Sequence, residues 1–345
     1  MLKISTIIPH AGGWELLQKC LISLYRSKDV EFETIIVENG SFERIEDRQV
    51  ESFHNLHILR FGQMLGFAGA CNRGVEAAQG KYIFLLNNDA EVEPDTLNIL
   101  SQALENDNYV AACQPKILSL RNPGEFDYSS ACGGEIDIYG FPFARGRIFD
   151  TIETDRGQYD DSTDIFWGAG AALMIRRDVY MNCGGLEEPF FAHMEEIDLQ
   201  WRFHLLGYTV KVVPQTAVHH LGAATIGYES PMKLYLNHRN NLAMLFRNYS
   251  LGSLVRYFPV RLLFDLIVMI GSVFSIKIKR TWAVLRAWGW FCLSMPYLIR
   301  GRIQIQRLRR VKDCEILRKI YPGSVVWQYF VNKRRIYSEL IKEIK

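Results

Sequence analysis

The sequence predicts an α/β fold, in which helices flank a central, mostly parallel sheet, followed by a helical C-terminal extension. Three observations support it. Short apolar runs alternate with amphipathic stretches from residue 1 to about 115, which is typical of a parallel sheet wrapped by helices. The 345-residue chain is 48% hydrophobic, enough for one large core. After residue 248 the composition becomes basic and apolar, so we expect a catalytic domain at 1–248 and an extension at 249–345.

The elements of the first domain follow from periodicity. Apolar runs predict four early strands, and apolar residues at helical spacing predict two helices between them. Residues 118–164 have weak periodicity and are predicted to form long, irregular connections, after which order resumes. The predicted strands are Ile4–Ile8, Thr34–Val37, His57–Leu59, Tyr82–Leu86 and Thr209–Val213. The predicted helices are Trp14–Tyr25, Ala68–Ala78 and Met194–Leu206. After the irregular connections, regular secondary structure is expected again at Ile165–Ile175.

The charge of the chain is unevenly distributed. Residues 246–345 hold 20 of the 40 Lys and Arg but only five of the 38 Asp and Glu. Such a basic block suits an anionic surface, either a phospholipid leaflet or nucleic acid. The apolar stretches Leu262–Ile276 and Trp282–Ile299 are shorter than the roughly 20 residues of a spanning helix and are flanked by Lys and Arg. We therefore expect a membrane-surface anchor and no nucleic acid; an ordinary helical subdomain with a basic face is the alternative.

The compartment is predicted from the cysteines and the N-terminus. The seven cysteines are scattered and none forms a C-x-x-C pair, which favours a reducing compartment. The first apolar run, Ile4–Ile8, is too short for a signal-peptide core. We expect a cytoplasmic protein, peripheral on the inner face of the plasma membrane.

A carboxylate follows the fourth predicted strand. Asp89 comes just after Tyr82–Leu86, and the carboxyl end of a parallel strand faces the crevice where α/β folds bind ligands. Asp89 would there hold a divalent ion against a diphosphate. A structural Asp that caps the next helix is the alternative.

A second group of carboxylates begins the helix predicted at Met194–Leu206. The helix macrodipole by itself favours acidic residues there. Asp198 and Arg202 are four residues apart and can pair on one helical face, which leaves Glu195 and Glu196 as candidates for a general base.

His219 and His220 stand side by side near the end of a strand. Adjacent side chains on a strand point to opposite faces, so at most one of them reaches a shared site. An Asp, a carboxylate cluster and a His that all follow strands of one sheet predict a joint site.

These motifs, in this order, resemble the family 2 glycosyltransferases of the GT-A fold, particularly a bacterial subgroup that includes rhamnosyltransferases. The resemblance covers residues 3–248. It rests on Ile7-Ile8-Pro9-His10, on Ile36-Val37-Glu38-Asn39-Gly40-Ser41, on the glycine-rich segment Gly66–Gly74, on Asn87-Asn88-Asp89 as a variant of the D-x-D motif, on Phe166–Ala172 and on the acidic motif Glu195–Arg202.

The resemblance implies roles for individual residues. Glu38 stands where the family usually has the Asp that contacts the donor's base or ribose, and Glu196 occupies the position of the catalytic base, next to Glu195. Asp89 and His220 are the implied metal ligands. His238-Arg239-Asn240-Asn241 resembles a family motif without an assigned role. The implied residues for binding the nucleotide sugar are Pro9, Glu38, Asn39, Gly66, Asn72, Asn87 and Asp89.

The predicted function is an inverting, metal-dependent glycosyltransferase. Mg²⁺ or Mn²⁺ suits oxygen ligands with one imidazole. The donor is expected to be a deoxythymidine or uridine diphosphate sugar, and the acceptor a cell-surface glycan or lipid-linked glycan. A nicotinamide oxidoreductase is one alternative, but this sequence has no G-x-G-x-x-G after its first strand. A sugar-nucleotide pyrophosphorylase is another, but the sequence has no Gly-rich, Arg-containing loop near its N-terminus. The third alternative is a non-catalytic membrane adaptor that keeps the fold.

Overall fold

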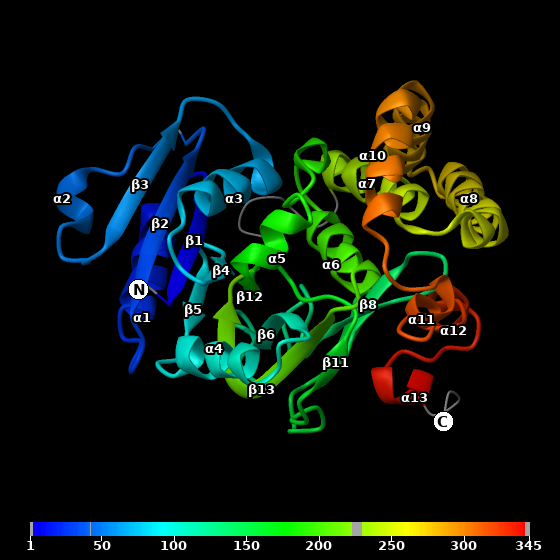
Figure 1. Cartoon of the computed structure of the whole chain (residues 1–345). Helices are drawn as coiled ribbons and strands as arrows, with labels where there is room; N and C mark the ends of the chain where they lie inside the picture. Colours follow the sequence, from blue (N-terminus) through cyan, green and yellow to red (C-terminus); the bar gives the residue numbers. More distant parts are fainter. Residues whose placement is uncertain (1–2, 42, 223–229, 342–345) are drawn as a thin grey trace.

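A computed structural model describes residues 3–41, 43–222 and 230–341 of the chain. Within these residues the strands form a nine-stranded central sheet and a separate four-stranded sheet (Figure 1). The central strands are β1 (Ile4–His10), β2 (Phe32–Asn39), β3 (Leu56–Phe61), β4 (Tyr82–Leu86), β5 (Ala90–Val92), β6 (Val110–Ser119), β11 (Thr163–Ile165), β12 (Ala172–Arg176) and β13 (Thr209–His220). The small sheet contains β7 (Gly134–Ile136), β8 (Pro142–Ala144), β9 (Arg147–Ile148) and β10 (Thr151–Ile152).

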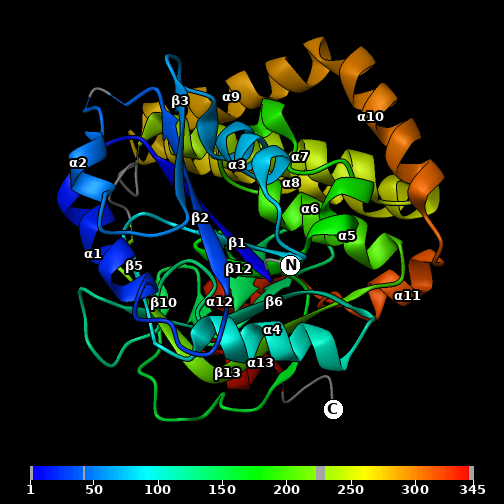
Figure 2. The same cartoon turned by 60° about the vertical axis from the view of Figure 1, so that its left-hand side comes forward.

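Helices cover both faces of the central sheet and form the C-terminal part of the chain (Figures 1 and 2). In the first part they are α1 (Trp14–Leu24), α2 (Asp47–Val50), α3 (Gly66–Ala77), α4 (Thr96–Asn106), α5 (Arg177–Asn182), the 3₁₀ turn η1 (Glu188–Phe190) and α6 (Glu195–Leu205). In the last third they are α7 (Pro231–Asn248), α8 (Leu251–Phe274), α9 (Ile278–Leu293), α10 (Met295–Leu308), α11 (Asp313–Leu317), α12 (Val325–Phe330) and α13 (Tyr337–Ile341).

The predicted α/β fold is confirmed. The central sheet has the order β11-β13-β6-β12-β4-β1-β2-β3, with β5 paired to β13, and its β4-β1-β2-β3 half is parallel. Helix α3 packs tightly on this half at Gly74, where an added Cβ would lie 2.3 Å from Cγ2 of Ile7. Strand β12 runs antiparallel between β4 and β6, while β13 runs parallel to β6. This arrangement brings the ends of β1, β4 and β13 to one edge of the sheet.

Two parts of the central region differ from the sequence-based prediction. Strand β6 was not predicted, because Gln114, Pro115 and Lys116 interrupt its apolar run, although all three are buried in the structure. Residues 118–164, predicted as irregular connections, contain the small sheet β7–β10. Its strands have only two or three residues each, too few to produce a detectable period.

The C-terminal helices contact α7, the end of α6 and the small sheet. Helices α9 and α10 pack along α7 (Figure 2). The chain then crosses to the small sheet, where the Tyr321 N–H donates to the Ile136 carbonyl at 2.9 Å. The apolar stretch Trp282–Ile299 is broken at Ser294, between α9 and α10. The domain boundary at residue 248 stays a prediction.

Candidate active site

A cavity of about 850 Å³ opens at the edge of the sheet where β1, β4 and β13 end. The start of α3, the loop before α6, the small sheet and helices α7–α9 supply the rest of its wall. It coincides with the crevice predicted from the sequence. The predicted site residues that line it are Pro9, Asn39, Gly66, Asn87, Asp89, Glu195, Glu196 and His220.

Asp89 and His220 meet on one wall of the cleft. Nε2 of His220 lies 3.2 Å from Oδ1 of Asp89 and 3.1 Å from the amide nitrogen of Asn87. On the other side of the ring, Nδ1 lies 3.1 Å from Oδ1 of Asp127. His219 points elsewhere, 3.8 Å from a carboxylate oxygen of Glu93, as expected for the neighbouring residue on a strand.

Asp127 is a site residue that sequence reasoning missed. It lies in the connection between β6 and β7, and only the fold brings it to the end of β13. Burial alone would lower the pKa of His220, but hydrogen bonds and the negative charges of Asp127 and Asp89 outweigh burial and raise it to about 10.

The chemistry of these groups fits a hard divalent cation. In the described ranges no group of three or more His, Cys, Asp or Glu side chains could hold a metal ion by itself. Asp89 and His220 offer one carboxylate and one imidazole, and a bound diphosphate and water would have to supply the other ligands. Asp127 binds Nδ1 and leaves Nε2 directed at Asp89, the arrangement in which a carboxylate orients a metal-binding histidine.

The acidic pair begins α6 and lines the same cleft. Glu195 is buried and Glu196 is half-buried, and in the described part of the chain one carboxylate oxygen of each lacks a hydrogen-bond partner. Burial raises the pKa of Glu196 to about 7, and burial together with the Glu196 charge raises the pKa of Glu195 well above its usual range. Burial raises the pKa of Cys71 in α3, and the charges of both Glu195 and Glu196 raise it further. Glu196 is the more exposed of the two carboxylates and is therefore the better placed to meet a ligand in the cleft.

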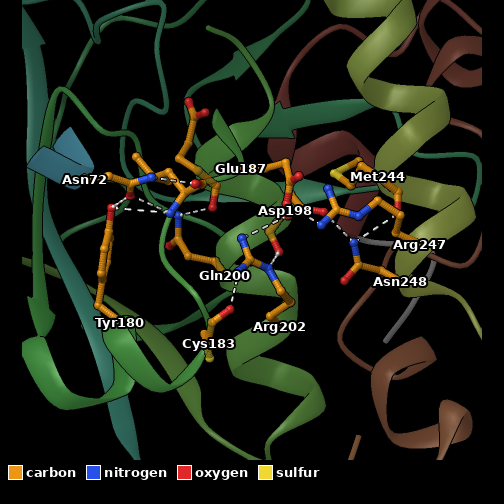
Figure 3. A network of polar contacts seen from close by, with 12 residues as sticks. Asn72, Tyr180, Cys183, Glu187, Asp198, Gln200, Arg202, Met244, Arg247 and Asn248 are labelled. Atoms are coloured by element: carbon orange, nitrogen blue, oxygen red, sulfur yellow. Dashed lines mark hydrogen bonds and ion pairs between the residues drawn. The ribbon is translucent and has the colours of Figure 1, made fainter. Parts of the chain in front are cut away.

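The predicted pairing of Asp198 with Arg202 is present, with 3.0 Å between nitrogen and oxygen. The side chain of Asn248 in α7 donates a second hydrogen bond to Asp198 at 2.7 Å, and Arg202 donates to the Cys183 carbonyl (Figure 3). Gln200 exchanges hydrogen bonds of 2.7 Å with the backbone of Gly168. These contacts fix the orientation of α6, and with it the direction of Glu196.

The loop before α6 has an unusual backbone. Phe191, His193 and Met194 have φ values of 67°, 69° and 71°, which side-chain-bearing residues rarely adopt. Asn240 holds this loop, because its amide group donates to the carbonyls of Phe190, Ala192 and His193 at 2.9, 3.0 and 2.7 Å. This contact gives the 238–241 motif, which had no assigned role, a structural function: it clamps the strained segment that carries the acidic pair.

Two predicted donor-binding residues do not line the cleft. Oε1 of Glu38 accepts a hydrogen bond from the Ile45 N–H at 2.7 Å, and Arg60 lies 3.3 Å from its other oxygen. The amide of Asn72 is bonded to Tyr180 and to the backbone of Leu186 (Figure 3). In this structure Glu38 and Asn72 thus hold the walls of the site together.

Asn39 and Gly66 line the cleft but are also engaged in packing. The side chain of Asn39 holds the start of α3. Its Oδ1 accepts a hydrogen bond from the Leu65 N–H at 2.6 Å, and its Nδ2 donates one to the Gly66 carbonyl at 3.0 Å. Gly66 has a φ of 74°, and an added Cβ would lie 2.5 Å from Phe191. The part of the cleft that is predicted to bind the nucleotide therefore packs directly against the loop that carries the acidic pair.

His10 is a second residue to which the sequence assigned no role. Its ring is buried at the end of β1, with Nδ1 3.1 Å from the amide nitrogen of Asn88, and it lines the cleft. Burial lowers its pKa. In the described residues its buried Nε2 has no hydrogen-bond partner.

An α/β sheet with a cleft at its strand ends, lined by a carboxylate–histidine pair and by an acidic pair, is typical of a nucleotide-dependent transferase. The sequence profile of Glycosyl transferase family 2 matches residues 5–183, and the chain belongs to this family. The prediction of a glycosyltransferase that uses a nucleotide-sugar donor in glycan synthesis is thereby confirmed.

Similar proteins agree with this assignment. An N-acetylglucosaminyl-diphospho-decaprenol L-rhamnosyltransferase of Mycobacterium tuberculosis is 24% identical over 252 residues, which cover 68% of this chain and 81% of the relative. The low-salt glycan biosynthesis hexosyltransferase Agl10 of Haloferax volcanii is 24% identical over 218 residues, covering 60% of this chain and 65% of the relative. The similarity to a rhamnosyltransferase confirms the predicted subgroup.

Solved structures share the fold. S. aureus TarS 1–349 in complex with UDP-GlcNAc has a TM-score of 0.57 at 15% identity and covers 95% of this chain and 91% of its own. GalNAc-T7 with UDP, GalNAc and Mn²⁺ has a TM-score of 0.56 at 14% identity, covering 71% of this chain and 48% of its own. At these identities the likeness establishes the GT-A-like architecture alone.

Proposed function

We propose that the protein is an inverting, metal-assisted glycosyltransferase in which Glu196 is the general base. The observation that carries this proposal is that one cleft is lined both by the Asp89–His220 pair and by Glu196, one of whose carboxylate oxygens lacks a hydrogen-bond partner in the described residues. A base and a leaving-group site within one cleft are what a single in-line displacement requires.

The chain's own groups perform the following step. Glu196 accepts the proton of an acceptor hydroxyl while that oxygen forms a bond to the anomeric carbon of the donor sugar. The bond from that carbon to the diphosphate oxygen breaks on the opposite side, so the configuration inverts and nucleoside diphosphate leaves. Asp89 and His220 would hold Mg²⁺ or Mn²⁺, which neutralises the charge of a leaving diphosphate when bound.

The raised pKa of Glu196 suits this role. A base with a pKa near the working pH is partly ionised and is still basic enough to take a hydroxyl proton. Gln200 and Asn240 orient the helix and loop that present it. Glu195, which is buried, would act by maintaining the electrostatics and packing around Glu196.

The substrate class is inferred from the relatives. The Mycobacterium tuberculosis relative is named for rhamnose transfer to a sugar on a diphosphate-linked polyprenol. For this chain we propose a deoxythymidine or uridine diphosphate sugar as donor and a lipid-linked glycan of the cell surface as acceptor.

A lipid-linked acceptor is held in a membrane, and α8 has the length and the exposed apolar side chains of a helix that binds a membrane. By length and composition α8 is, among the described residues, the helix long and apolar enough to cross a membrane. Its polar residues Arg261 and Asp265 are buried against the protein, whereas apolar side chains face outward: Leu263, Ile267 and Phe274 are 53%, 56% and 84% exposed. We propose that this face lies in the cytoplasmic surface of the plasma membrane, as an interfacial anchor.

The donor half of the proposal is tested by a thermal-shift panel of nucleoside diphosphates and nucleotide sugars, with and without Mn²⁺. We expect one base to raise the melting temperature, and only with the metal. Asp89→Ala should abolish this metal-dependent shift and remain folded, while Glu91→Gln in the adjacent β5 should keep it. An Asp89→Ala variant with undiminished Mn²⁺ dependence would remove Asp89 from the site.

A further inference from the structure

His238 is a cleft residue that the proposed reaction does not use. It belongs to α7, two positions before the Asn240 that holds the loop carrying Glu196, and it lines the cleft. Its side chain is 14% exposed. A histidine that keeps part of its surface open to a cleft can contact a ligand there, so the residues that hold its ring decide which ring atom does so.

Asp265 of α8 orients the imidazole of His238. Nδ1 of the ring lies 2.7 Å from Oδ1 of Asp265, a carboxylate that is 1% exposed. Because an ionised carboxylate only accepts hydrogen bonds, Nδ1 carries a hydrogen and donates it. The other ring nitrogen, Nε2, makes no hydrogen bond within the described ranges of the chain. Nε2 is therefore the atom that the ring can offer to a molecule in the cleft.

Asp265 does not need His238 to satisfy its carboxylate. A guanidinium nitrogen of Arg261 lies 2.5 Å from Oδ1, and the indole N–H of Trp288 donates to Oδ2 at 3.1 Å. Arg261 in turn donates to the side-chain oxygen of Asn241 at 2.8 Å. The carboxylate is thus held by other groups, and its contact with Nδ1 fixes the ring of the histidine, as a carboxylate does for a functional histidine elsewhere.

The same helix that holds His238 has the exposed apolar face. Arg261 and Asp265 are 2% and 1% exposed, whereas Leu263 and Ile267 are 53% and 56% exposed. One side of α8 therefore supports the cleft residue, and the other is the side proposed to lie in the membrane surface. In that orientation His238 is about one helix diameter, roughly 10 Å, from the membrane.

The position of His238 favours the acceptor over the donor. The predicted donor residues come from the N-terminal strands and α3, whereas His238 comes from the C-terminal helices, which lie on the other side of the molecule from β1–β3 (Figure 1). A lipid-linked acceptor approaches from the membrane and thus along α8. Its sugar has to reach Glu196, whose loop is held by the same helix, α7.

A hydroxyl is the ligand group that suits Nε2. A neutral imidazole with its hydrogen on Nδ1 presents a lone pair at Nε2, and an imidazolium presents an N–H there. A hydroxyl can donate to the first and accept from the second, so it binds either form of the ring. An ionised phosphate oxygen only accepts and would bind the charged form alone.

We propose that Nε2 of His238, oriented by Asp265, binds a hydroxyl of the acceptor sugar other than the one that attacks the donor. This inference rests on the proposed function, in which Glu196 takes the proton of the attacking hydroxyl. A second contact on the same sugar fixes which of its hydroxyls reaches the base. His238 is thereby a residue that determines acceptor specificity.

Two amide variants separate the two nitrogens of His238. The amide of Asn reaches the position of Nδ1 and that of Gln the position of Nε2, so His238→Asn keeps the contact with Asp265 and His238→Gln keeps the contact with the ligand. The probe is farnesyl-diphospho-N-acetylglucosamine, a short-chain form of the proposed acceptor class, titrated into the full-length protein in detergent and EDTA. Farnesyl diphosphate, which has no sugar, is the control ligand.

We expect the wild-type protein to bind the sugar-bearing probe more tightly than farnesyl diphosphate. His238→Asn should weaken binding of the sugar-bearing probe by about five- to tenfold, the worth of one hydrogen bond, and leave that of farnesyl diphosphate unchanged. His238→Gln should retain more of the sugar binding than His238→Asn, although it loses the contact with Asp265. Binding of UDP or dTDP with Mn²⁺ should persist in both, which shows that they are folded. His57→Asn, on the exposed side of β3, is the matched control.

The opposite order of the two variants would overturn the proposal. Native affinity in His238→Asn together with weakened binding in His238→Gln assigns His238 a structural role through Nδ1 alone. Wild-type protein that binds both probes equally, or neither of them, holds no acceptor sugar at this position. Failure of the proposed function is distinguishable, since wild-type protein would then bind no nucleotide with Mn²⁺.

Discussion

At the scale of single residues, the cleft contains two groups whose pKa values are raised for different reasons. Burial raises the pKa of Glu196, whereas two carboxylates raise that of His220 in spite of burial. Such paired shifts mark the positions where a site holds or moves protons. Asp127, Asn240 and His10 extend the site beyond the residues that the sequence singled out.

The pH dependence of transfer follows from Glu196. A general base acts only when ionised, and the pKa of Glu196 is raised to about 7. We therefore expect kcat/KM to be level above this pH and to fall by about tenfold per pH unit below it. A profile from initial rates between pH 5 and 9 measures this. A profile that stays flat down to pH 5 would mean that no such base limits the reaction.

At the scale of elements, α7 connects the active site to the C-terminal helices. Its Asn240 holds the strained loop on one side, and its Asn248 binds Asp198 on another. Both asparagines are fully buried on the same helix, so they form a matched pair for mutation.

Asn240→Ala should affect catalysis more than its effect on stability explains. It leaves three loop carbonyls without their donor, so the free energy of unfolding should fall by about 1–3 kcal/mol and the rate of transfer by about tenfold or more. Nucleotide binding with Mn²⁺ should be retained. Asn248→Ala should lose comparable stability with a smaller loss of rate. Equal rate losses in the two variants, measured well below their melting temperatures, would contradict a positioning role for Asn240.

The exposed apolar side chains of α8 predict that the protein binds membranes. Sedimentation with anionic vesicles should show binding that decreases in high salt but persists, because basic residues supply a screened attraction and inserted side chains a salt-resistant one. Leu263→Asp with Ile267→Asp should remove the salt-resistant part. Ile22→Asp, on the exposed side of α1, should not. Binding that is unaffected by the α8 substitutions would place the contact elsewhere.

At the scale of the whole molecule, the features predictable from sequence are local. The apolar runs of β1 and β4, the position of Asp89 after a strand, the opposite directions of His219 and His220, and the pairing of Asp198 with Arg202 each depend on residues close together in the chain. Periodicity and spacing are sufficient for these.

The features that the sequence did not reveal depend on long-range contacts. Asp127 reaches His220 across 93 positions of the chain, and Asn240 reaches the loop before α6 across about 50. Neither residue type has a local pattern that marks such a contact. The small sheet escaped prediction because its short strands are stabilised by Tyr321 and its neighbours, almost 200 residues away.

The central claim, that Glu196 is the general base of a glycosyl transfer in this cleft, is tested most directly by Glu196→Gln. The change keeps shape and hydrogen-bonding capacity but removes basicity, so the rate of transfer should fall by roughly 10²–10⁴-fold while the affinity for the donor hardly changes. Glu195→Gln, which changes the more buried of the two side chains, should have a smaller effect. Near-native transfer by Glu196→Gln, measured with the same donor and acceptor, would contradict the mechanism, and loss of turnover in Glu195→Gln alone would assign the base to that neighbour.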